Sequence, residues 1–218
     1  MAALADVAVP APPANPLYRN LYDAHWKIDR ASFLARAAGA EFDAARADMD
    51  ALLAHVAATE ALSHDILAAG GLPEQVINAD LHTDNVLVAD DGTGGVAVTG
   101  VLDFEFAARD WRVMECVVGL SKYAGLGDPL PPMAAYVAGY AAAGGRLTRR
   151  EVALVPRLIV SRVCNNVVYF MGRAVAGEDS IEPLAGRVGV YARRCRWLLE
   201  HDTDIVAAFE AADGLVVD

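Results

Sequence analysis

The segment that most constrains the fold lies between residues 75 and 105. Short apolar runs rich in β-branched residues flank a polar loop that carries Asp80 and Asn85, and a later run places Asp103 at its C-terminal end. Between the runs, residues 90–95 form a polar stretch whose glycines accept positive φ angles. The pattern predicts a β-hairpin that brings the polar loop close to the strand end bearing Asp103.

These three polar residues are of the types that metal-assisted phosphoryl transfer needs. The reaction requires a carboxylate to orient the attacking hydroxyl and oxygen ligands to hold Mg²⁺ against the phosphates. An Asp, an Asn five residues later and a second Asp after a hairpin supply that set. The spacing predicts Asp80 as the general base, with Asn85 and Asp103 as ligands of Mg²⁺. Taken singly, Asp80 and Asp103 could also be ordinary turn or strand-end aspartates.

Residues 78–88, with the sequence NADLHTDNVLV, resemble the catalytic loop of the aminoglycoside phosphotransferase, choline kinase and homoserine kinase group, usually written H-G-D-L-H-x-x-N-V-L. Residues 101–106, VLDFEF, are similar to the metal-binding I-D-F-E/D segment of the same group. The resemblance implies a protein-kinase-like fold, ATP or another nucleoside triphosphate as co-substrate, Mg²⁺, and a small-molecule hydroxyl acceptor. Two positions depart from the pattern, because Asn78 stands where the group usually has His and Ala79 where it has Gly.

Three more residues around the loop have roles that the resemblance suggests. The usual His helps to hold the loop, so we expect Asn78 to keep a hydrogen bond there. We also expect His82 to support the loop, although a base or metal ligand is an alternative. Glu105, two residues beyond Asp103, is either a further carboxylate at the metal site or a solvated turn acid.

The resemblance covers only part of a kinase. Kinases of this type bind the nucleotide between a β-rich N-terminal lobe, with a glycine-rich loop and a lysine strand, and a helical C-terminal lobe. The residues before the catalytic loop contain neither feature. We therefore expect residues 1–16 to be an N-terminal segment with a proline-rich connector, and residues 17–218 to correspond to the C-terminal lobe without its nucleotide lobe. A second polypeptide or self-association would then supply the missing lobe.

The expected fold class is α+β and mainly helical, with a central hairpin. The catalytic loop and hairpin occupy residues 75–105, and a helical acceptor-binding part occupies residues 112–212. Helical spacing of apolar residues predicts helices over residues 17–38, 41–69, 112–123, 132–143, 148–176 and 182–201, with a short turn over 205–212. Thr148 and Glu151 form a capping-box pattern at one helix start, whereas Pro156 should kink that helix or mark its true beginning.

Composition narrows the partners and the compartment. A chain of 218 residues with 55% hydrophobic content can bury one sizeable core. The formal charge of −11 argues against nucleic acid, whose phosphates would be repelled; it serves solubility or lines an acidic pocket for a cationic substrate. Three widely spaced cysteines indicate neither a disulfide framework nor a zinc site and favour the cytoplasm. No uninterrupted apolar run reaches the length of a membrane span, so no membrane is expected.

A polar stripe on the longest predicted helix is a candidate acceptor-binding surface. Arg162, Asn166, Tyr169 and Arg173 are separated by four, three and four residues, which places them on one face of a helix otherwise rich in apolar residues. Such a stripe either faces water or lines a cleft opposite Asp80. In the cleft, the arginines could hold a carboxylate or phosphate and the other two could orient hydroxyl groups.

Two rival functions deserve comparison with a kinase. The Asp-x-His pattern of Asp80 and His82 also resembles the opening of a two-metal phosphoesterase site, but that site needs further His and carboxylate ligands in suitable motifs, which the remaining histidines do not provide. The second rival is a catalytically inactive kinase-like lobe that serves as a small-molecule binding or regulatory module. The intact set of Asp80, Asn85 and Asp103 argues against it, and the absent glycine-rich loop argues for it.

Overall fold

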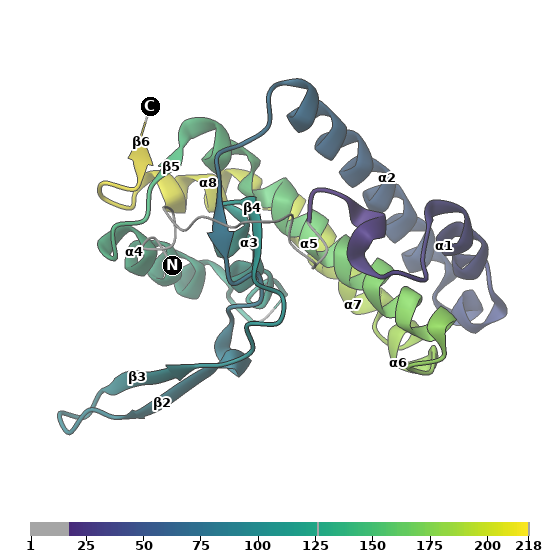
Figure 1. Ribbon diagram of the computed structural model, residues 1–218, viewed down its shortest axis with the longest axis horizontal. Coiled ribbons are helices and arrows are strands. Elements are labelled where there is room, and N and C mark those ends of the chain that lie inside the picture. The colour runs from purple at the N-terminus through teal and green to yellow at the C-terminus, as the bar shows by residue number, and fades with distance from the viewer. Residues whose placement is uncertain (1–17, 126, 218) are drawn as a thin grey trace.

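The computed structural model describes residues 18–125 and 127–217 of the chain, so the expected segment over residues 1–16 lies outside the described residues. Figure 1 shows a mainly helical body in which α5 (Arg149–Ala176) runs through the middle. Helices α2 (Arg46–Ala68), α3 (Met114–Ser121), α7 (Val188–Glu200) and α8 (Asp202–Glu210) pack against it. The short elements η2 (Leu21–Ala24), α1 (Arg30–Ala37), η3 (Ala40–Ala45), α4 (Leu130–Ala142) and α6 (Glu182–Ala185) complete the helical part.

The central helix begins where the sequence predicts. Thr148 is its N-cap: the Thr148 hydroxyl accepts a hydrogen bond from the backbone N–H of Glu151, and the Glu151 carboxylate accepts one from the backbone N–H of Thr148 at 2.7 Å. Pro156 lies inside the helix and does not mark its start. Arg112 also donates to Glu151, at 2.8 Å, which ties the start of α5 to the segment before α3.

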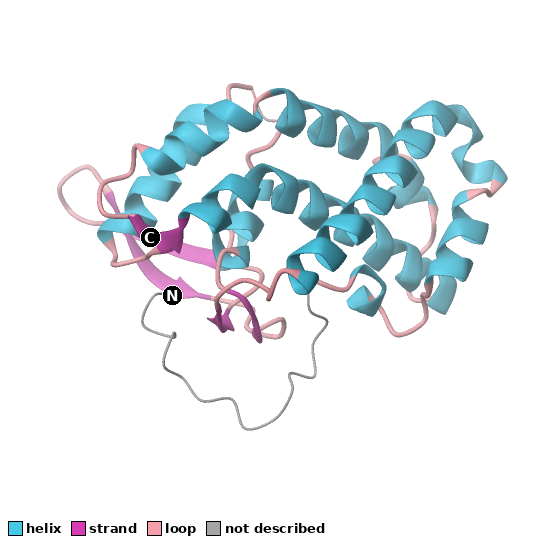
Figure 2. Ribbon diagram, turned by 90° about the horizontal axis from the view of Figure 1, so that it is seen from above, coloured by secondary structure: helices cyan, strands magenta, loops and turns pink. Residues whose placement is uncertain are grey.

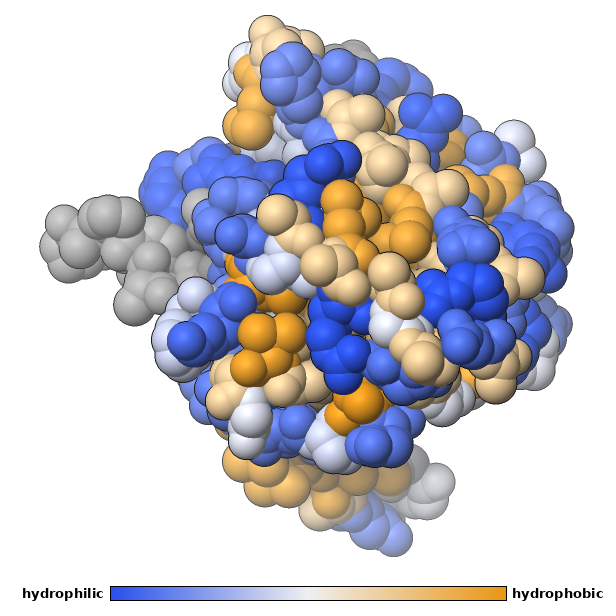
Figure 3. Space-filling model, turned by 90° about the vertical axis from the view of Figure 1, so that its right-hand side faces the viewer, coloured by the Kyte–Doolittle hydropathy of each residue, from blue (hydrophilic) through white to orange (hydrophobic). Residues whose placement is uncertain are grey.

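The helix α5 has the composition of a core helix. Among the described residues it alone is long and apolar enough to cross a membrane by length and composition, but 67% of its most apolar window is buried inside the protein. Apolar side chains from α2, α3, α5 and α7 form one continuous core, which includes Met49, Leu120, Ile159 and Leu198. On the face shown in Figure 3, hydrophilic residues alternate with smaller hydrophobic groups.

The strands gather at one end of the molecule (Figure 2) and form three separate pairs. The predicted hairpin is present as β2 (Val86–Asp90) and β3 (Val96–Val101), which pair antiparallel. It projects from the helical body (Figure 1) instead of occupying its centre. Strand β1 (Glu74–Ile77) pairs antiparallel with β4 (Ala108–Trp111), a strand that the sequence did not suggest, and β5 (Leu147–Thr148) pairs parallel with β6 (Val216–Val217).

Several predicted helices are shorter or divided. The segment 17–38 contains η2 and α1 separated by a turn, because the Asp29 side chain caps α1 in a box with Ser32. The segment 41–69 opens with η3, and α2 begins only at Arg46. The segment 182–201 divides into α6 and α7. The helix predicted over 112–123 is shorter, from Met114 to Ser121 (α3), because the chain up to Trp111 pairs as β4.

A buried aspartate joins the first described residues to this framework. Asp110 on β4 is 1% exposed, and its two carboxylate oxygens accept hydrogen bonds from the backbone N–H groups of Tyr18 at 2.8 Å and Trp111 at 2.7 Å. Burial raises the pKa of Asp110 from 3.8 to about 6, although both hydrogen bonds oppose this rise. Because burial outweighs the two hydrogen bonds, the folded protein favours the protonated carboxyl group more than the unfolded chain does.

We expect this group to make folding stability depend on pH. Because the folded pKa lies above the unfolded one, the stabilisation from protonation is fully present below about pH 4 and is lost as the pH rises through about 6. The free energy of unfolding, measured relative to an Asp110→Asn variant that cannot titrate, should fall by on the order of 3 kcal/mol between pH 4 and 7. Denaturation curves across this range test the expectation. A constant difference between the two proteins would contradict it.

Candidate active site

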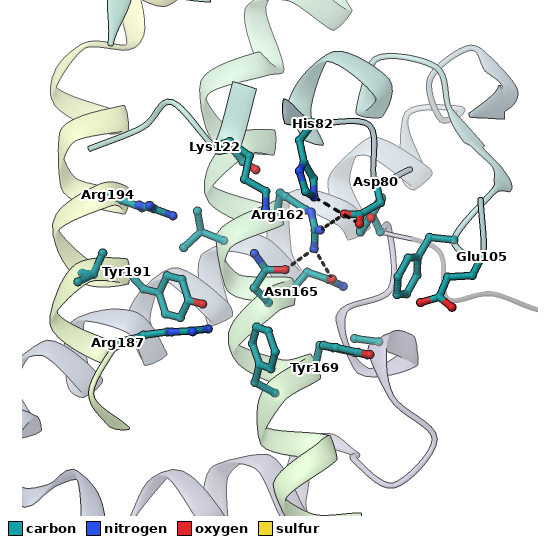
Figure 4. Close-up of a pocket in the computed structure, with 18 residues that line it drawn as sticks. Asp80, His82, Glu105, Lys122, Arg162, Asn165, Tyr169, Arg187, Tyr191 and Arg194 are labelled. Carbon is teal, nitrogen blue, oxygen red and sulfur yellow. Dashed lines mark hydrogen bonds and ion pairs between the residues drawn. The ribbon is translucent and has the colours of Figure 1, made fainter. Parts of the chain in front are cut away.

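A cavity of about 510 Å³ lies where the loop after β1 meets α5 and α7. Figure 4 shows Asp80 and His82 on the loop side, Arg162, Asn165 and Tyr169 in the middle, and Arg187, Tyr191 and Arg194 on the α7 side. The polar and aromatic lining residues are Tyr18, Asp80, His82, Glu105, Phe106, Ser121, Lys122, Arg162, Asn165, Asn166, Tyr169, Phe170, Arg187, Tyr191 and Arg194.

The carboxylate of Asp80 is held by groups on both of its oxygens. Arg162 donates from Nη2 to Oδ1 at 3.2 Å, and Asn85 donates from Nδ2 to Oδ2 at 3.1 Å. The same Asn85 nitrogen also donates to the backbone carbonyl of Asp80 at 3.0 Å. His82 Nε2 lies 3.4 Å from Oδ2. The side chain is only 16% exposed, so its position in the cavity wall is fixed rather than free to rotate.

The loop that carries Asp80 begins with a turn at Ala79, whose backbone conformation is strained. Ala79 has a φ angle of 66°, in the left-handed region that favours glycine. Its neighbours hold the turn from both sides: the carboxylate of Glu115 accepts from the backbone N–H of Asn78 at 2.8 Å and of Ala79 at 3.4 Å, and the Tyr18 hydroxyl donates to the Ala79 carbonyl. Asn78 Oδ1 accepts from the backbone N–H of Asp80 at 3.0 Å.

Burial sets the charge states of the groups that hold the turn. Glu115 is 1% exposed, and this burial raises its pKa, while the two backbone donors act in the opposite direction. Burial likewise raises the pKa of Tyr18 to about 12, so its hydroxyl stays protonated at neutral pH and remains a donor. The Tyr18 ring lies 4.9 Å from the guanidinium carbon of Arg162, which adds a cation–π contact to the same cluster.

The hydrogen bonds of His82 suit a supporting role. Its Nδ1 accepts from the backbone N–H of Asp84 at 3.2 Å, which places the ring proton of the neutral form on Nε2, toward Asp80. Burial lowers the pKa of His82, with a smaller contribution from Lys122, against the opposing effect of Asp80 and Asp84. A neutral His82 whose only lone pair is already used has no capacity to act as a base here.

The two expected metal ligands lie beside the loop and do not line the cavity. Asn85 directs its amide nitrogen to Asp80, which leaves its Oδ1 oxygen for another group, and its carbonyl accepts from the backbone N–H of Leu102 at 2.9 Å. That bond brings the residue before Asp103 to Asn85. Asp103 is exposed, with φ at 60°, and within residues 18–125 and 127–217 its carboxylate has no hydrogen bond or ion pair.

These donors fit a hard cation that keeps other ligands. An amide oxygen and a carboxylate are the donor types that Mg²⁺ prefers, with water and phosphate oxygens as the remaining ligands. In the described part of the chain no group of three or more His, Cys, Asp or Glu residues could hold a metal by itself. Asn85 and Asp103 would therefore hold Mg²⁺ together with water or phosphate oxygens.

The remaining predicted site residues separate into two groups. Glu105, Arg162, Asn166 and Tyr169 all line the cavity. Arg173 does not: it lies near the end of α5, where it pairs with Asp179 at 3.2 Å and Glu178 at 3.3 Å. Within the stripe, Arg162 Nη1 donates to Asn166 Oδ1 and, at 3.4 Å, to Asn165 Oδ1.

Sequence reasoning did not find several residues that shape the site. Glu115 could have been recognised from the sequence, because it is an acidic residue within a mostly apolar segment that forms the buried helix α3. The spacing of four and three residues also predicts one shared helix face for Arg187, Tyr191 and Arg194, at the start of α7 and within it. Tyr18 and Lys122 have no local pattern that marks them. Their contacts exist only in the folded chain.

The charge of the cavity differs from that of the whole protein. The chain carries a formal charge of −11, which left an acidic pocket as one interpretation. The lining instead contains the cations Lys122, Arg162, Arg187 and Arg194. Its acids are Asp80 and Glu105, and Asp80 is already paired with Arg162. This lining does not favour an acidic pocket for a cationic substrate, and solubility remains the other interpretation of the net charge.

An aspartate is held in the cavity wall by an asparagine five residues later, and a second aspartate follows the hairpin, so the groups that a phosphoryl-transfer site requires are present. The chain belongs to the phosphotransferase enzyme family, whose sequence profile matches residues 1–154. This match confirms the resemblance of the loop to the aminoglycoside phosphotransferase group. No characterised protein and no solved structure matches the chain at a significant level.

We expect Glu115 to stabilise the protein through the loop backbone. Glu115→Ala would leave the backbone N–H groups of Asn78 and Ala79 buried without an acceptor, which should lower the free energy of unfolding by about 1 to 3 kcal/mol. Glu115→Gln keeps one acceptor oxygen and should restore most of that loss. Chemical denaturation of both variants at pH 7 measures the difference. Equal destabilisation by Ala and Gln would show that the backbone bonds are not the source of the effect.

Proposed function

We propose that this protein transfers the γ-phosphate of ATP, or of another nucleoside triphosphate, to a hydroxyl group of a small molecule. The observation that carries the proposal is the carboxylate of Asp80, which lines the cavity while Asn85 and Arg162 hold its two oxygens. Family membership supports the reaction class. The acceptor is a small hydroxyl compound of an aminoglycoside-like, amino-alcohol or homoserine-like kind.

In this reaction Asp80 is the general base. The acceptor hydroxyl donates its hydrogen bond to Asp80, its oxygen forms a bond to the γ-phosphorus, and the bond from that phosphorus to the β,γ-bridging oxygen breaks, so that ADP leaves. The hydroxyl proton passes to the Asp80 carboxylate. When bound, Mg²⁺ neutralises charge on the phosphates, and Asn85 and Asp103 are the residues that would hold it. Arg162 and Asn85 keep the carboxylate aimed at the cavity.

The acceptor contacts follow from the lining of the cavity. Asn166 and Tyr169 share the α5 face with Arg162 and are proposed to orient the acceptor through hydrogen bonds. Arg173 is left out of this set because Glu178 and Asp179 already pair with it at the end of α5.

The nucleotide needs a cover that we place outside the described residues, supplied by a second polypeptide or by self-association. Support comes from the hairpin, where Leu87, Val88, Val96 and Val98 are between 49% and 72% exposed, a concentration of apolar surface unusual for a strand pair in water. If a second copy provides the cover, the affinity for MgATP should rise with protein concentration as the protein associates. Sedimentation with and without MgATP checks this.

We expect Asp80→Asn to abolish most phosphoryl transfer while the fold persists. Removal of a general base typically lowers the rate by about 10² to 10⁴. The amide keeps the shape of the side chain, and Asp65→Asn, on the exposed face of α2, is the matched control. Steady-state kinetics with any acceptor that the wild type accepts gives the comparison. A near-normal kcat in Asp80→Asn would exclude the role of base. A wild type that binds acceptor and nucleotide but transfers nothing would favour the binding-module alternative.

We expect Asp103→Ala to weaken the binding of Mg²⁺–nucleotide. Loss of one charged ligand contact of about 1.5 to 3 kcal/mol corresponds to roughly 10- to 100-fold in Kd. Titration calorimetry with MgATP, and with ATP in the presence of EDTA, separates the metal-dependent part of the affinity. Asp50→Ala, an exposed aspartate on α2, is the control for the change in net charge. An unchanged metal-dependent affinity in Asp103→Ala would remove this residue from the metal site.

A further inference from the structure

The α7 wall of the cavity presents cations that no part of the proposed phosphoryl-transfer step uses. Arg187, Tyr191 and Arg194 occupy one face of α7, and Figure 4 shows their side chains extending from that helix toward α5. Lys122, just beyond the end of α3, lines the same cavity. Asp80 lies on the opposite side, across α5 (Figure 4). The cavity thus has a carboxylate at one end and a cationic wall at the other.

Two of these cations lack an acidic partner among the described residues, and the third has a weak one. Across residues 18–125 and 127–217, neither Arg187 nor Arg194 forms an ion pair. Arg187 only lies over the ring of Phe170, at 5.8 Å from its centroid. Lys122 has a single partner, the largely exposed Asp84, at 3.5 Å. Uncompensated cations in a concave site raise the local concentration of anions.

Three hydrogen-bond donors of cavity-lining residues have no partner among the described residues. The Nε atoms of Arg162 and Arg194 and the Nδ2 atom of Asn165 are buried, and no acceptor among the described residues reaches them. All three belong to residues that line this cavity, and Asn165 is only 5% exposed. Because these three atoms have almost no exposed surface, a ligand in the cavity would instead meet the unpaired guanidinium groups of Arg187 and Arg194.

We propose that the acceptor of this enzyme carries an anionic group, a carboxylate or a phosphate monoester, which Arg187, Arg194 and Lys122 bind while its hydroxyl lies at Asp80. The proposal rests on the proposed function for the hydroxyl end only. Guanidinium groups bind both anions through paired N–H donors, so these two chemistries share one site. A cationic acceptor such as an aminoglycoside would meet like charges at this wall and is disfavoured.

The triphosphate of the nucleotide is a less suitable occupant of the cationic wall. Asn85 and Asp103, the residues proposed to hold Mg²⁺ against the phosphates, do not line the cavity. The nucleotide would therefore approach Asp80 from the side of the hairpin. This leaves the α7 side for the acceptor.

The first test compares four small probes that share the same diol and differ in charge. These are glycerol, glycerate, glycerol 3-phosphate and 3-amino-1,2-propanediol, added to the full chain without nucleotide. Ligand-observed NMR titration should show binding of glycerate or glycerol 3-phosphate at least tenfold tighter than glycerol, with no binding of the amine. Whichever of the two anions binds more tightly identifies the anionic group that the site prefers, carboxylate or phosphate. Equal binding of the amine, or of neutral glycerol, overturns the proposal.

The second test removes the cations one at a time. Arg194→Gln and Arg187→Gln should each weaken the preferred anion by about 10- to 100-fold, as expected for the loss of a charge-assisted contact. Arg196→Gln removes the same charge from an exposed position of the same helix that does not line the cavity, and it should leave the affinity unchanged. Thermal unfolding confirms that each variant is folded. A loss as large in Arg196→Gln as in the other two would show a general charge effect and overturn the site.

Nucleotide and activity measurements separate this proposal from the one on which it rests. Suppose that Arg187→Gln and Arg194→Gln weaken the binding of MgATP as much as the binding of the anion. The two arginines then bind the nucleotide, and the proposal of an anionic acceptor fails while the proposed kinase function stands. If anion binding behaves as expected but no anionic diol is phosphorylated by wild type with MgATP, the anion site stands and the proposed function fails.

Discussion

The buried carboxylate of Glu115 is the interaction on which the geometry of the site depends. The loop must turn sharply between β1 and Asp80, and the residue at the turn, Ala79, has a left-handed conformation that costs a residue with a Cβ atom about 1 to 2 kcal/mol. Glu115 compensates by accepting the backbone N–H groups at the turn, and Tyr18 holds the carbonyl on its other side. The strained turn then aims Asp80 into the cavity. The position of the Asp80 carboxylate, the proposed general base, therefore depends on backbone contacts between segments far apart in the sequence.

Arg162 links this turn to the rest of the cavity. Its guanidinium pairs with Asp80, donates to the side chains of Asn165 and Asn166, and lies against the ring of Tyr18. These contacts connect the central helix α5 directly to the loop that carries Asp80. The same helix packs against α7, which carries the unpaired cations. One rigid helix thus fixes the distance between the two chemically different ends of the site, which is what an enzyme needs to select acceptors by length as well as by charge.

The sequence predicted the parts of the protein that depend on short-range patterns. The capping box at Thr148, the extent of α5 and the hairpin after the polar loop all follow from neighbouring residues, and the structure contains each of them. The hairpin was also predicted to bring the polar loop close to the strand end bearing Asp103, and the hydrogen bond from the backbone N–H of Leu102 to the Asn85 carbonyl places the residue before Asp103 at that loop. These features are local, so a single sequence is sufficient to find them.

The remaining features could not be read in this way, because they depend on contacts between distant segments. Tyr18 and Ala79, or Arg112 and Glu151, meet only after folding. Strand β4 was missed because its ARDW sequence has no alternation of apolar and polar residues, and only its pairing with β1 defines it. The stripe on α5 was predicted as one surface, but the cavity ends before Arg173, which pairs locally instead.

The projecting hairpin has a consequence for the timing of catalysis. A two-stranded ribbon that projects from the body is at best marginally stable in water, so β2 and β3 should open and close more readily than the core. Leu102, which bonds to Asn85, follows directly after β3, and Asp103 follows Leu102. Disorder in the ribbon would therefore spread to one proposed metal ligand while leaving Asp80, held by the core, in place. Covering the ribbon would order the segment that carries Asp103, while Asp80 is held by the core in either case.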